Sequence, residues 1–211
     1  ILMTLLMPSI HKARGKAKTA VCLSNVRSMG AANLSFSNDN AAYFVSGDWI
    51  EDLRPYGDLS PIIFCPEATN LSKSTNWGRD ITAWVYRGST SSYGFNMWAF
   101  DWRDSSGIKP DGRSDEQYFY KTSRVEIPSE TPLVFDSIWI DSRPSSNDDE
   151  SKYYSMDGSN NYHLGRVFIN RHHSKKVNYL KVDGSAEVVP LTQLYQMDWH
   201  RDWARRPLIV P

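Results

Sequence analysis

The chain begins with a stretch whose polarity changes abruptly, and this change constrains the fold more than any other feature. Residues 1–8 read ILMTLLMP and are apolar apart from Thr4. In residues 9–36, small or apolar side chains recur at steps of three and four residues, which is the period of one face of an α-helix. These positions are Ile10, Ala13, Ala17, Ala20, Val21 and Ser24. The stretch predicts a long N-terminal helix with an apolar start.

The predicted helix is basic and ends at a turn signal. The first acidic residue of the chain is Asp39, and the basic residues before it are Lys12, Arg14, Lys16, Lys18 and Arg27. Pro8 has no amide hydrogen, so we expect it to break or kink the helix, with Ser9 capping the part that follows. Residues 37–40 read SNDN, which favours a turn, so we expect the helical domain to span residues 1–36.

The remainder, residues 37–211, is predicted to be a β-rich head. Segments rich in aromatic and β-branched residues recur, without the strand–helix alternation of a parallel sheet. They span 81–87, 91–100, 118–127, 131–140, 166–173, 176–182 and 185–191. Residues 41–46 are strand-like or the end of the helical unit, and residues 61–66, bounded by two prolines, are typical of a short strand or its entry. We therefore predict an α+β fold in which the long helix packs on an antiparallel β-sheet, with exposed polar insertions at 101–116 and 141–161.

Composition excludes several functions. Lys plus Arg and Asp plus Glu both number 24, so the chain lacks the basic excess of a nucleic-acid-binding protein. The apolar start is far shorter than the ~20 residues that span a bilayer, so the chain has no membrane segment or starts inside one. The sequence contains no Gly-rich phosphate loop, zinc-ligand spacing or G-x-S-x-G elbow. We predict that the protein is not an enzyme.

The two cysteines leave two interpretations open. Cys22 lies on the predicted helix and Cys65 lies in the segment PIIFCPE. In a cytosolic protein they would be free buried thiols, whereas in an exported protein they would form a single disulfide.

The C-terminal segment contains a hairpin signal and two histidines. Asp183-Gly184 separates two strand-like runs, and in a tight hairpin both turn residues must tolerate positive φ. His172 or His173 could pair with Asp183 as an acid–base or metal pair. The structural alternative, a hairpin turn plus a histidine bonded to a neighbouring loop, is favoured.

Two further ligand sites are weaker candidates. Calcium could bind hard oxygen ligands, of which the candidates are Asp101, Asp104, Asp148 and Asp149, but the spacing of an EF-hand is missing. A sugar-stacking surface could use Trp77, Trp84, Trp98, Trp102 and Trp139, most of which we expect in the core or at a subunit interface. The basic helix could meet anionic lipid headgroups or the acids of a neighbouring subunit.

Several motifs together resemble a known family. His173 followed after nine residues by Asp183-Gly184 is similar to the signature of the prepilin-type H-X9-DG proteins of planctomycetes and their relatives. The resemblance covers nearly the whole chain. The other similar elements, in order, are the leucines and Pro8 before a basic Ala-rich helix with Cys22-x-x-Asn25-x-Arg27, PIIFCPEA at 61–68, SSYGFN at 91–96, TPLVFDS at 131–137 and LTQLYQMDWHRDW at 191–203.

The resemblance implies a type IV pilin-like or type II secretion pseudopilin-like structural subunit without a cofactor, although some pseudopilins bind calcium. It implies a helical homo-oligomeric filament outside the cell, assembled from an inner-membrane platform and held by helix packing. The helix residues concerned are Ile1, Leu2, Leu5, Leu6, Ile10, Ala13 and Ala17. It also favours a Cys22–Cys65 disulfide and a structural role for His173, Asp183 and Gly184.

Family members begin with a basic leader, a cleavage site and an apolar run with an early glutamate. None of these precedes Ile1, so we expect the chain to lack its first part. The alternative function is a surface-anchored module that binds polysaccharide or another extracellular ligand through exposed aromatic side chains. A third hypothesis is a hydrolase that uses His173 and Asp183.

Overall fold

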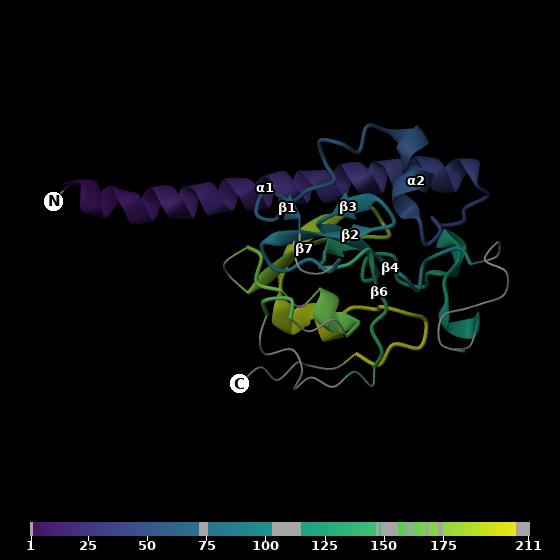
Figure 1. The fold of residues 1–211 in the computed structure, drawn as a ribbon. Helices are drawn as coiled ribbons and strands as arrows, with labels where there is room; N and C mark the ends of the chain where they lie inside the picture. Colours follow the sequence, from purple (N-terminus) through teal and green to yellow (C-terminus); the bar gives the residue numbers. More distant parts are fainter. Residues whose placement is uncertain are drawn as a thin grey trace.

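The computed structural model describes residues 2–71, 76–102, 115–146, 148, 156–159, 162–167, 169–172 and 175–205. A long helix, α1 (Leu2–Asp39), lies along a β-rich head and projects beyond it at the N-terminal end (Figure 1). The predicted α+β class is confirmed. Among the described residues, no helix combines the length and hydropathy needed to cross a bilayer.

Helix α1 is more continuous than predicted, and it ends later. It continues through Pro8, so the expected break is wrong. Pro8 removes one backbone hydrogen bond near the start of the helix, and the remaining turns keep theirs. The helix also runs three residues past the expected end, to Asp39. At 1.5 Å per residue, its 38 residues span about 57 Å.

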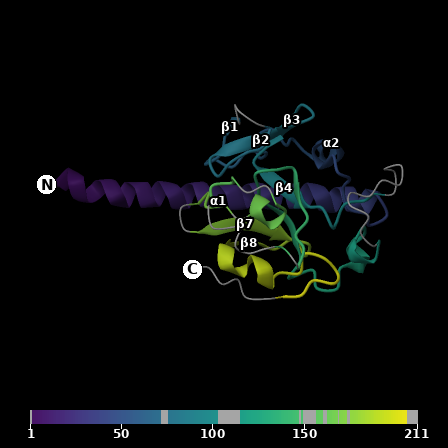
Figure 2. The same cartoon turned by 60° about the horizontal axis from the view of Figure 1, so that its bottom comes forward.

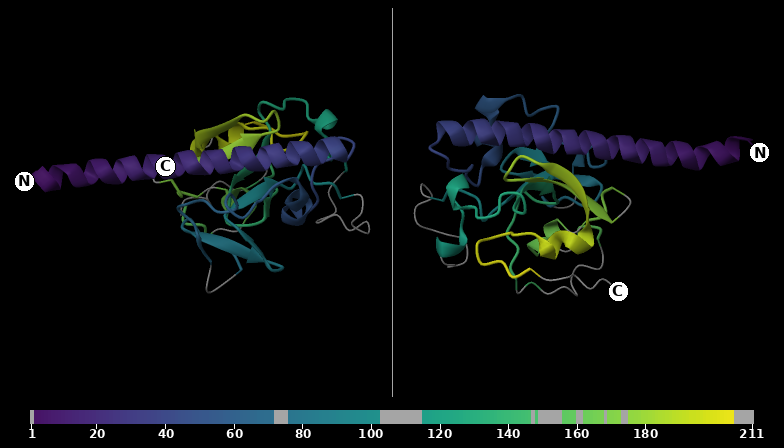
Figure 3. Two further views of the ribbon diagram at one scale, coloured as in Figure 1. Left: turned by 90° about the horizontal axis from the view of Figure 1, so that it is seen from above. Right: turned by 180° about the vertical axis from the view of Figure 1, so that it is seen from behind.

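Only the C-terminal half of α1 packs on the head, as both views in Figure 3 show. The side chains that face the head are Cys22, Asn25, Val26, Met29, Ala32, Asn33 and Ser37, again at steps of three and four. The face recognised in the sequence, which includes Ala13 and Ala17, is exposed instead. Gly30 permits close approach, because a Cβ there would lie 2.5 Å from Cδ2 of Leu180.

The main sheet has five strands in the order β6-β4-β5-β7-β8, of which β4, β7 and β8 are labelled in Figure 2. Their bounds are β4 (Tyr93–Asn96), β5 (Pro132–Asp136), β6 (Asp141–Ser142), β7 (Lys176–Lys181) and β8 (Ala186–Pro190). A second sheet contains β1 (Asn70–Leu71), β2 (Thr82–Tyr86) and β3 (Ser89–Ser91). Pairing is antiparallel except for β4 with β6 and β1 with β2.

Short helices complete the head. They are α2 (Trp49–Leu53) and the 3-10 helices η1 (Arg54–Tyr56), η3 (Asp115–Gln117), η4 (Thr122–Arg124), η6 (Leu164–Arg166) and η7 (Leu191–Gln196). Of the two polar insertions predicted to be loops, 101–116 and 141–161, the described parts include the start of η3 and the whole of β6, so this prediction was too simple.

Four segments with strand-like sequences form no strand in their described residues. Residues 41–46 and 118–127 share only an isolated bridge between Tyr43 and Lys121, residues 61–66 form turns, and the described part of 166–173 contains the end of η6. Tyr120 has a positive φ of 57°, which is incompatible with a strand. Phe44, Tyr118 and Phe119 lie in the core, and β propensity largely reflects such burial rather than a backbone preference.

Four tryptophans lie at the centre of the head with no exposed surface: Trp49, Trp84, Trp98 and Trp199. Each indole N–H donates to a backbone carbonyl, at 2.9 Å to Ile140, 2.9 Å to Tyr93, 2.8 Å to Pro144 and 2.7 Å to Leu194, respectively. Trp84 and Trp98 therefore belong to the core and cannot stack on a sugar.

The β7–β8 hairpin is present, but its turn differs from the predicted one. Gly184 has a φ of +84°, whereas Asp183 is not at positive φ. The amide of Gly184 donates to Lys181 at 3.0 Å, and the amide of Lys181 donates to Ser185 at 2.8 Å. The loop thus has three residues with glycine in the left-handed position. The Asp183 carboxylate accepts from the amide and hydroxyl of Ser185 at 2.9 and 2.6 Å.

Candidate functional site

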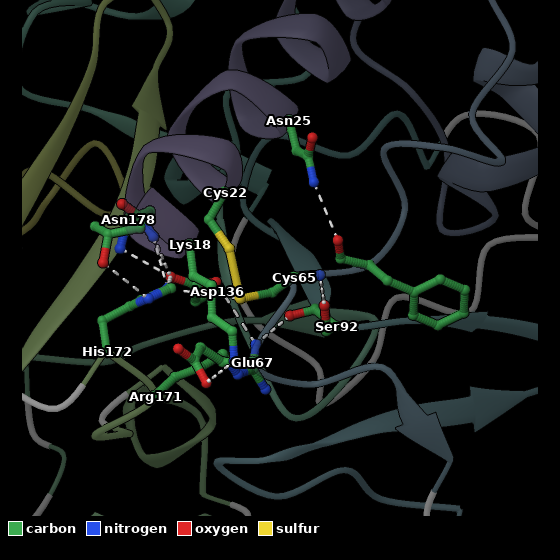
Figure 4. The surroundings of a disulfide bond; sticks show 12 residues. Lys18, Cys22, Asn25, Cys65, Glu67, Ser92, Asp136, Arg171, His172 and Asn178 are labelled. Carbon is green, nitrogen blue, oxygen red and sulfur yellow. Dashed lines mark hydrogen bonds and ion pairs between the residues drawn. A yellow bond between two sulfur atoms is a disulfide. The ribbon is translucent and has the colours of Figure 1, made fainter. Parts of the chain in front are cut away.

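A disulfide joins α1 to the head. Cys22 of α1 and Cys65 of the loop before β1 are bonded, with Cα atoms 5.2 Å apart, and both are fully buried. This is the pairing that the family resemblance implies. Beside it, Lys18 of α1 forms an ion pair with Glu67 at 3.1 Å. Figure 4 places both contacts within a larger group of polar side chains that comes from separate parts of the chain.

Asp136, at the end of β5, lies at the centre of this group and is fully buried. Its Oδ2 accepts hydrogen bonds from the backbone amide and Nδ2 of Asn178, at 2.9 and 3.1 Å. His172 Nε2 lies 3.1 Å from the same oxygen. Oδ1 faces Nη1 of Arg171 at 3.6 Å, beyond hydrogen-bond distance, and makes no hydrogen bond.

Arg171 holds several segments together from the interior. Its guanidinium donates to the carbonyls of Asp80 at 2.8 Å, Arg79 at 2.9 Å and Ser137 at 3.1 Å, and also to that of Ser92. Burial lowers the pKa of Arg171, and the charge of Asp136 opposes this effect. Because a buried cation is costly without compensation, these acceptors and Asp136 fix the arrangement of the loops around it.

The electrostatics of Asp136 favour its ionised form. Burial alone would raise the pKa of this carboxyl group, but its electrostatic interaction and hydrogen bond with His172, the charge of Arg171 and the hydrogen bond from the Asn178 amide together hold the pKa below its usual range. Tyr93 lies in the same region, and burial, with Asp136 as a second cause, raises the pKa of its phenol. The cluster therefore carries a buried carboxylate opposite a buried guanidinium, beside a neutral phenol.

His172 connects the cluster to α1. Thr19 Oγ1 lies 3.3 Å from His172 Nδ1 and donates its own hydrogen to the Gly15 carbonyl at 3.0 Å. The hydroxyl can therefore only accept from the ring, so Nδ1 carries a hydrogen. The other ring nitrogen, Nε2, lies 2.7 Å from Asn178 Nδ2 and 3.7 Å from Cys65 Sγ.

The Cys22-x-x-Asn25-x-Arg27 motif provides further contacts between α1 and the head. Asn25 Nδ2 donates to the Phe64 carbonyl at 3.0 Å and to the Tyr93 hydroxyl at 3.2 Å. Arg27 donates to the carbonyl of Ala186 in β8 at 3.2 Å. The three motif residues thus attach one helical segment to two different parts of the head.

The described residues do not bring a histidine into contact with Asp183, as the sequence-based acid–base hypothesis required. His173 lies outside them, and Asp183 caps the β7–β8 turn. His172 instead contacts Asp136. Sequence reasoning missed Arg171 and Asn178 as cluster members, and it included Asp136 only within the TPLVFDS motif. No regular spacing relates these residues, so only that motif could have suggested one of them.

The calcium candidates remain predictions. Asp104 and Asp149 lie outside the described residues. Asp101 lines a groove beside Trp102, and the Asp148 carboxylate accepts from the Ser145 amide at 3.2 Å. In the described part of the chain, the group of His, Cys, Asp and Glu side chains close enough to share a metal is Cys22, Cys65, Asp136 and His172.

The predicted assembly residues lie on the projecting part of α1. Ile1 lies outside the described residues, and for Leu2, Leu5 and Leu6 only the helical backbone is described. Ile10, Ala13 and Ala17 are exposed, as is every side chain from Met7 to Arg14. The described large apolar side chains of this half, Met7 and Ile10, are 61% and 47% exposed.

Comparisons with known proteins found no matching family model, no matching curated protein and no matching solved structure.

Proposed function

We propose that this chain is a type IV pilin-like or pseudopilin-like structural subunit, without enzymatic activity, that assembles through α1 into a filament. The observation that carries this proposal is the form of α1. Its C-terminal half is covalently attached to the head, and its N-terminal half projects with exposed side chains (Figure 1). We further propose assembly from an inner-membrane platform and an extracellular location, as the family resemblance implies.

Burial against a partner would stabilise the projecting half of α1, because most helix stability in proteins comes from tertiary packing. Met7 and Ile10 are 61% and 47% exposed, and their burial between subunits would gain free energy at about 25 cal/mol per Å² of apolar area. Copies of α1 packed together would supply that burial.

The outward face of α1 suits close helix packing. It carries small side chains along its length: Ala13, Ala17, Ala20, Ser24, Ser28, Ala31 and Ser35, all exposed. The hydroxyls of Ser28 and Ser35 donate to the carbonyls four residues earlier, at 3.1 Å each. These hydroxyls therefore need no partner from outside, and the face can approach another helix closely.

Charge distribution supports contacts between the stem of one copy and the head of another. Five of the 24 basic residues and none of the 24 acidic residues precede Asp39. Residues 1–38 therefore carry a formal charge of +5, and residues 39–211 carry −5. Side-by-side stems in register would repel one another, whereas a staggered arrangement places a basic stem beside an acidic head.

The test is assembly of the protein with its native N-terminus in the cells that produce it. Filaments sheared from the cell surface are imaged by electron microscopy, and their main subunit is identified by mass spectrometry. The variant Ala13→Glu/Ala17→Glu places charge on the exposed face of α1 and touches no residue of the head. We expect it to fold and to abolish filaments, whereas the exposed head variant Ser129→Glu retains them.

Two results would count against the proposal. One is a native chain that stays monomeric and soluble with its complete N-terminus. The other is normal filament formation by Ala13→Glu/Ala17→Glu. Assembly should also weaken as salt concentration rises, since salt screens contacts between the basic stem and the acidic head.

A groove in the head favours a second candidate function, binding of an extracellular polysaccharide. Its lining includes the aromatic side chains of Tyr43, Tyr86, Trp102 and Trp139 together with the acids Asp48, Asp52, Asp101 and Asp141. Partly exposed rings beside acidic hydrogen-bond acceptors can stack on sugar faces and bind hydroxyls. Glycan binding that Trp102→Ala abolishes and the exposed Tyr162→Ala preserves, with no filament formed, would favour this function.

A further inference from the structure

Four metal-ligand atoms converge at the junction of α1 and the head. The Sγ atoms of Cys22 and Cys65, a carboxylate oxygen of Asp136 and a ring nitrogen of His172 all lie within 4.8 Å of one another. All four residues are buried (Figure 4). In the disulfide form the sulfurs are bonded to each other and are not thiolates, so the set can serve a metal only after reduction.

We propose that the reduced chain binds one zinc ion through Cys22, Cys65, His172 and Asp136, and that disulfide formation releases it. Two thiolates, an imidazole and a carboxylate are a ligand set that zinc accepts in a closed tetrahedral site. Zinc bond lengths place a nitrogen and a sulfur ligand about 3.5 Å apart, and a nitrogen and an oxygen ligand about 3.3 Å apart. In the structure, His172 Nε2 lies 3.7 Å from Cys65 Sγ and 3.1 Å from Asp136 Oδ2.

The hydrogen bonds of His172 direct the correct nitrogen toward the site. Because Nδ1 donates to Thr19, Nε2 presents its lone pair when the ring is neutral. That lone pair lies 2.7 Å from Nδ2 of Asn178 and 3.1 Å from Oδ2 of Asp136, so a metal ion bound there would replace the hydrogen bond from the Asn178 amide. The bond from Nδ1 to Thr19 is also the outer contact that typically orients a metal-bound histidine.

A buried cation lies beside the proposed site and opposes its net charge. Zinc with two thiolates, one carboxylate and a neutral imidazole carries one net negative charge, and the buried Arg171 guanidinium lies 3.6 Å from Asp136 Oδ1. That oxygen and Oδ1 of Asn178 are buried without a hydrogen-bond partner. Oδ2, the oxygen 3.1 Å from His172 Nε2, would be the zinc ligand, while Oδ1 remains facing Arg171.

The chemistry of the switch balances with ordinary thiol reagents. A trialkylphosphine reduces the Cys22–Cys65 bond to two thiols, and water supplies the oxygen of the phosphine oxide. Zinc binding then releases the two thiol protons. In the reverse direction, an oxidised small-molecule disulfide takes up two electrons and two protons to give two thiols, while the two cysteine thiolates form their bond and zinc leaves.

A cavity lies beside the site. It is lined by His172, Thr19 and Glu67 together with basic residues of α1, so it borders the cluster on the side of His172 that faces Thr19. Opening the S–S bond frees the two sulfurs to move to the ~3.8 Å separation that a shared zinc ion requires.

The test is a zinc titration of the purified chain, anaerobically reduced with a trialkylphosphine, in competition with a chromophoric chelator. We expect one zinc per reduced chain and none for the oxidised chain. Cobalt bound in place of zinc should give thiolate charge-transfer bands and tetrahedral ligand-field bands. His172→Gln and Asp136→Asn should each weaken zinc binding at least about tenfold, while Asp58→Asn, which changes an exposed carboxylate, leaves it unchanged.

Circular dichroism in the near ultraviolet follows folding in the same samples. If the reduced chain unfolds without metal, zinc should restore the native spectrum in the wild type and not in His172→Gln. The proposal is overturned if the reduced chain binds no zinc. It is equally overturned if both ligand variants bind zinc as tightly as the wild type, because the two cysteines alone would then account for zinc binding, without His172 or Asp136.

Discussion

Replacement of the disulfide by Cys22→Ala/Cys65→Ala should cost a large share of the stability of the head. The two cysteines are 43 residues apart in sequence, so the bond closes a long loop in the unfolded chain. The chain-entropy relation for a loop of this size gives about 4 kcal/mol. For a chain of this length each kcal/mol corresponds to roughly 2–4 °C, so the melting temperature should fall by about 8–16 °C.

The assay is urea unfolding at equilibrium, followed by tryptophan fluorescence, because four of the tryptophans are fully buried in the head. The wild type is compared with the double variant and with Ser24→Ala, an exposed position on the same helix. We expect a lower midpoint for the double variant alone. Reduction of the wild type in the presence of a chelator should lower its midpoint to that of the variant, which should itself be insensitive to reductant.

Two outcomes would refute this reasoning. If the double variant unfolds within about 1 kcal/mol of the wild type, loop closure does not govern the stability of the junction. If reductant lowers the midpoint of the variant as much as that of the wild type, the loss has another origin than the Cys22–Cys65 bond.

The remaining predictions concern the buried charge, the hairpin turn and the helix packing. Asp136→Asn should cost about 3–5 kcal/mol in urea unfolding at neutral pH, because it leaves the Arg171 guanidinium without its carboxylate. The pKa of Asp136 is lower in the folded state than in the unfolded state, so ionised Asp136 stabilises the fold above the unfolded pKa of about 3.9, and this stabilisation is lost as pH falls through the folded pKa. The free energy of unfolding of Asp136→Asn should therefore fall less steeply on acidification than that of the wild type. An identical pH dependence in the two proteins would contradict a stabilising role for ionised Asp136. Gly184→Ala should destabilise by about 1–2 kcal/mol because of the positive φ, whereas Gly15→Ala, with nothing within 4 Å of the new Cβ, should stabilise the helix by up to about 1 kcal/mol in thermal unfolding. Gly30→Val should lower the free energy of unfolding by about 1–3 kcal/mol, because the valine side chain clashes with Leu180. Adding Leu180→Ala to this variant should recover part of the loss, and no recovery would argue against the contact.

Local patterns were sufficient to predict the long helix and the C-terminal hairpin. The basic, Ala-rich period of residues 9–36 predicted α1, and Asp183-Gly184 predicted the β7–β8 hairpin. Two errors have different origins. Pro8 does not end the helix, because it removes only one backbone hydrogen bond. Residues 118–127 are rich in strand-forming side chains, but Tyr118, Phe119 and Val125 pack into the core without entering a sheet.

The sequence by itself determined the class of fold, the presence of a long basic helix and the separation of positive stem from negative head, because these depend on neighbours in the chain. Only the tertiary structure decided which face of α1 packs on the head, and that His172 contacts Asp136. It also decided which buried groups surround the disulfide. His172 Nε2 and Asp136 Oδ2 meet across 36 residues of sequence, and Cys65 and His172 across 107. Contacts of this kind arise from the closure of the whole fold around α1, which no spacing within one segment encodes.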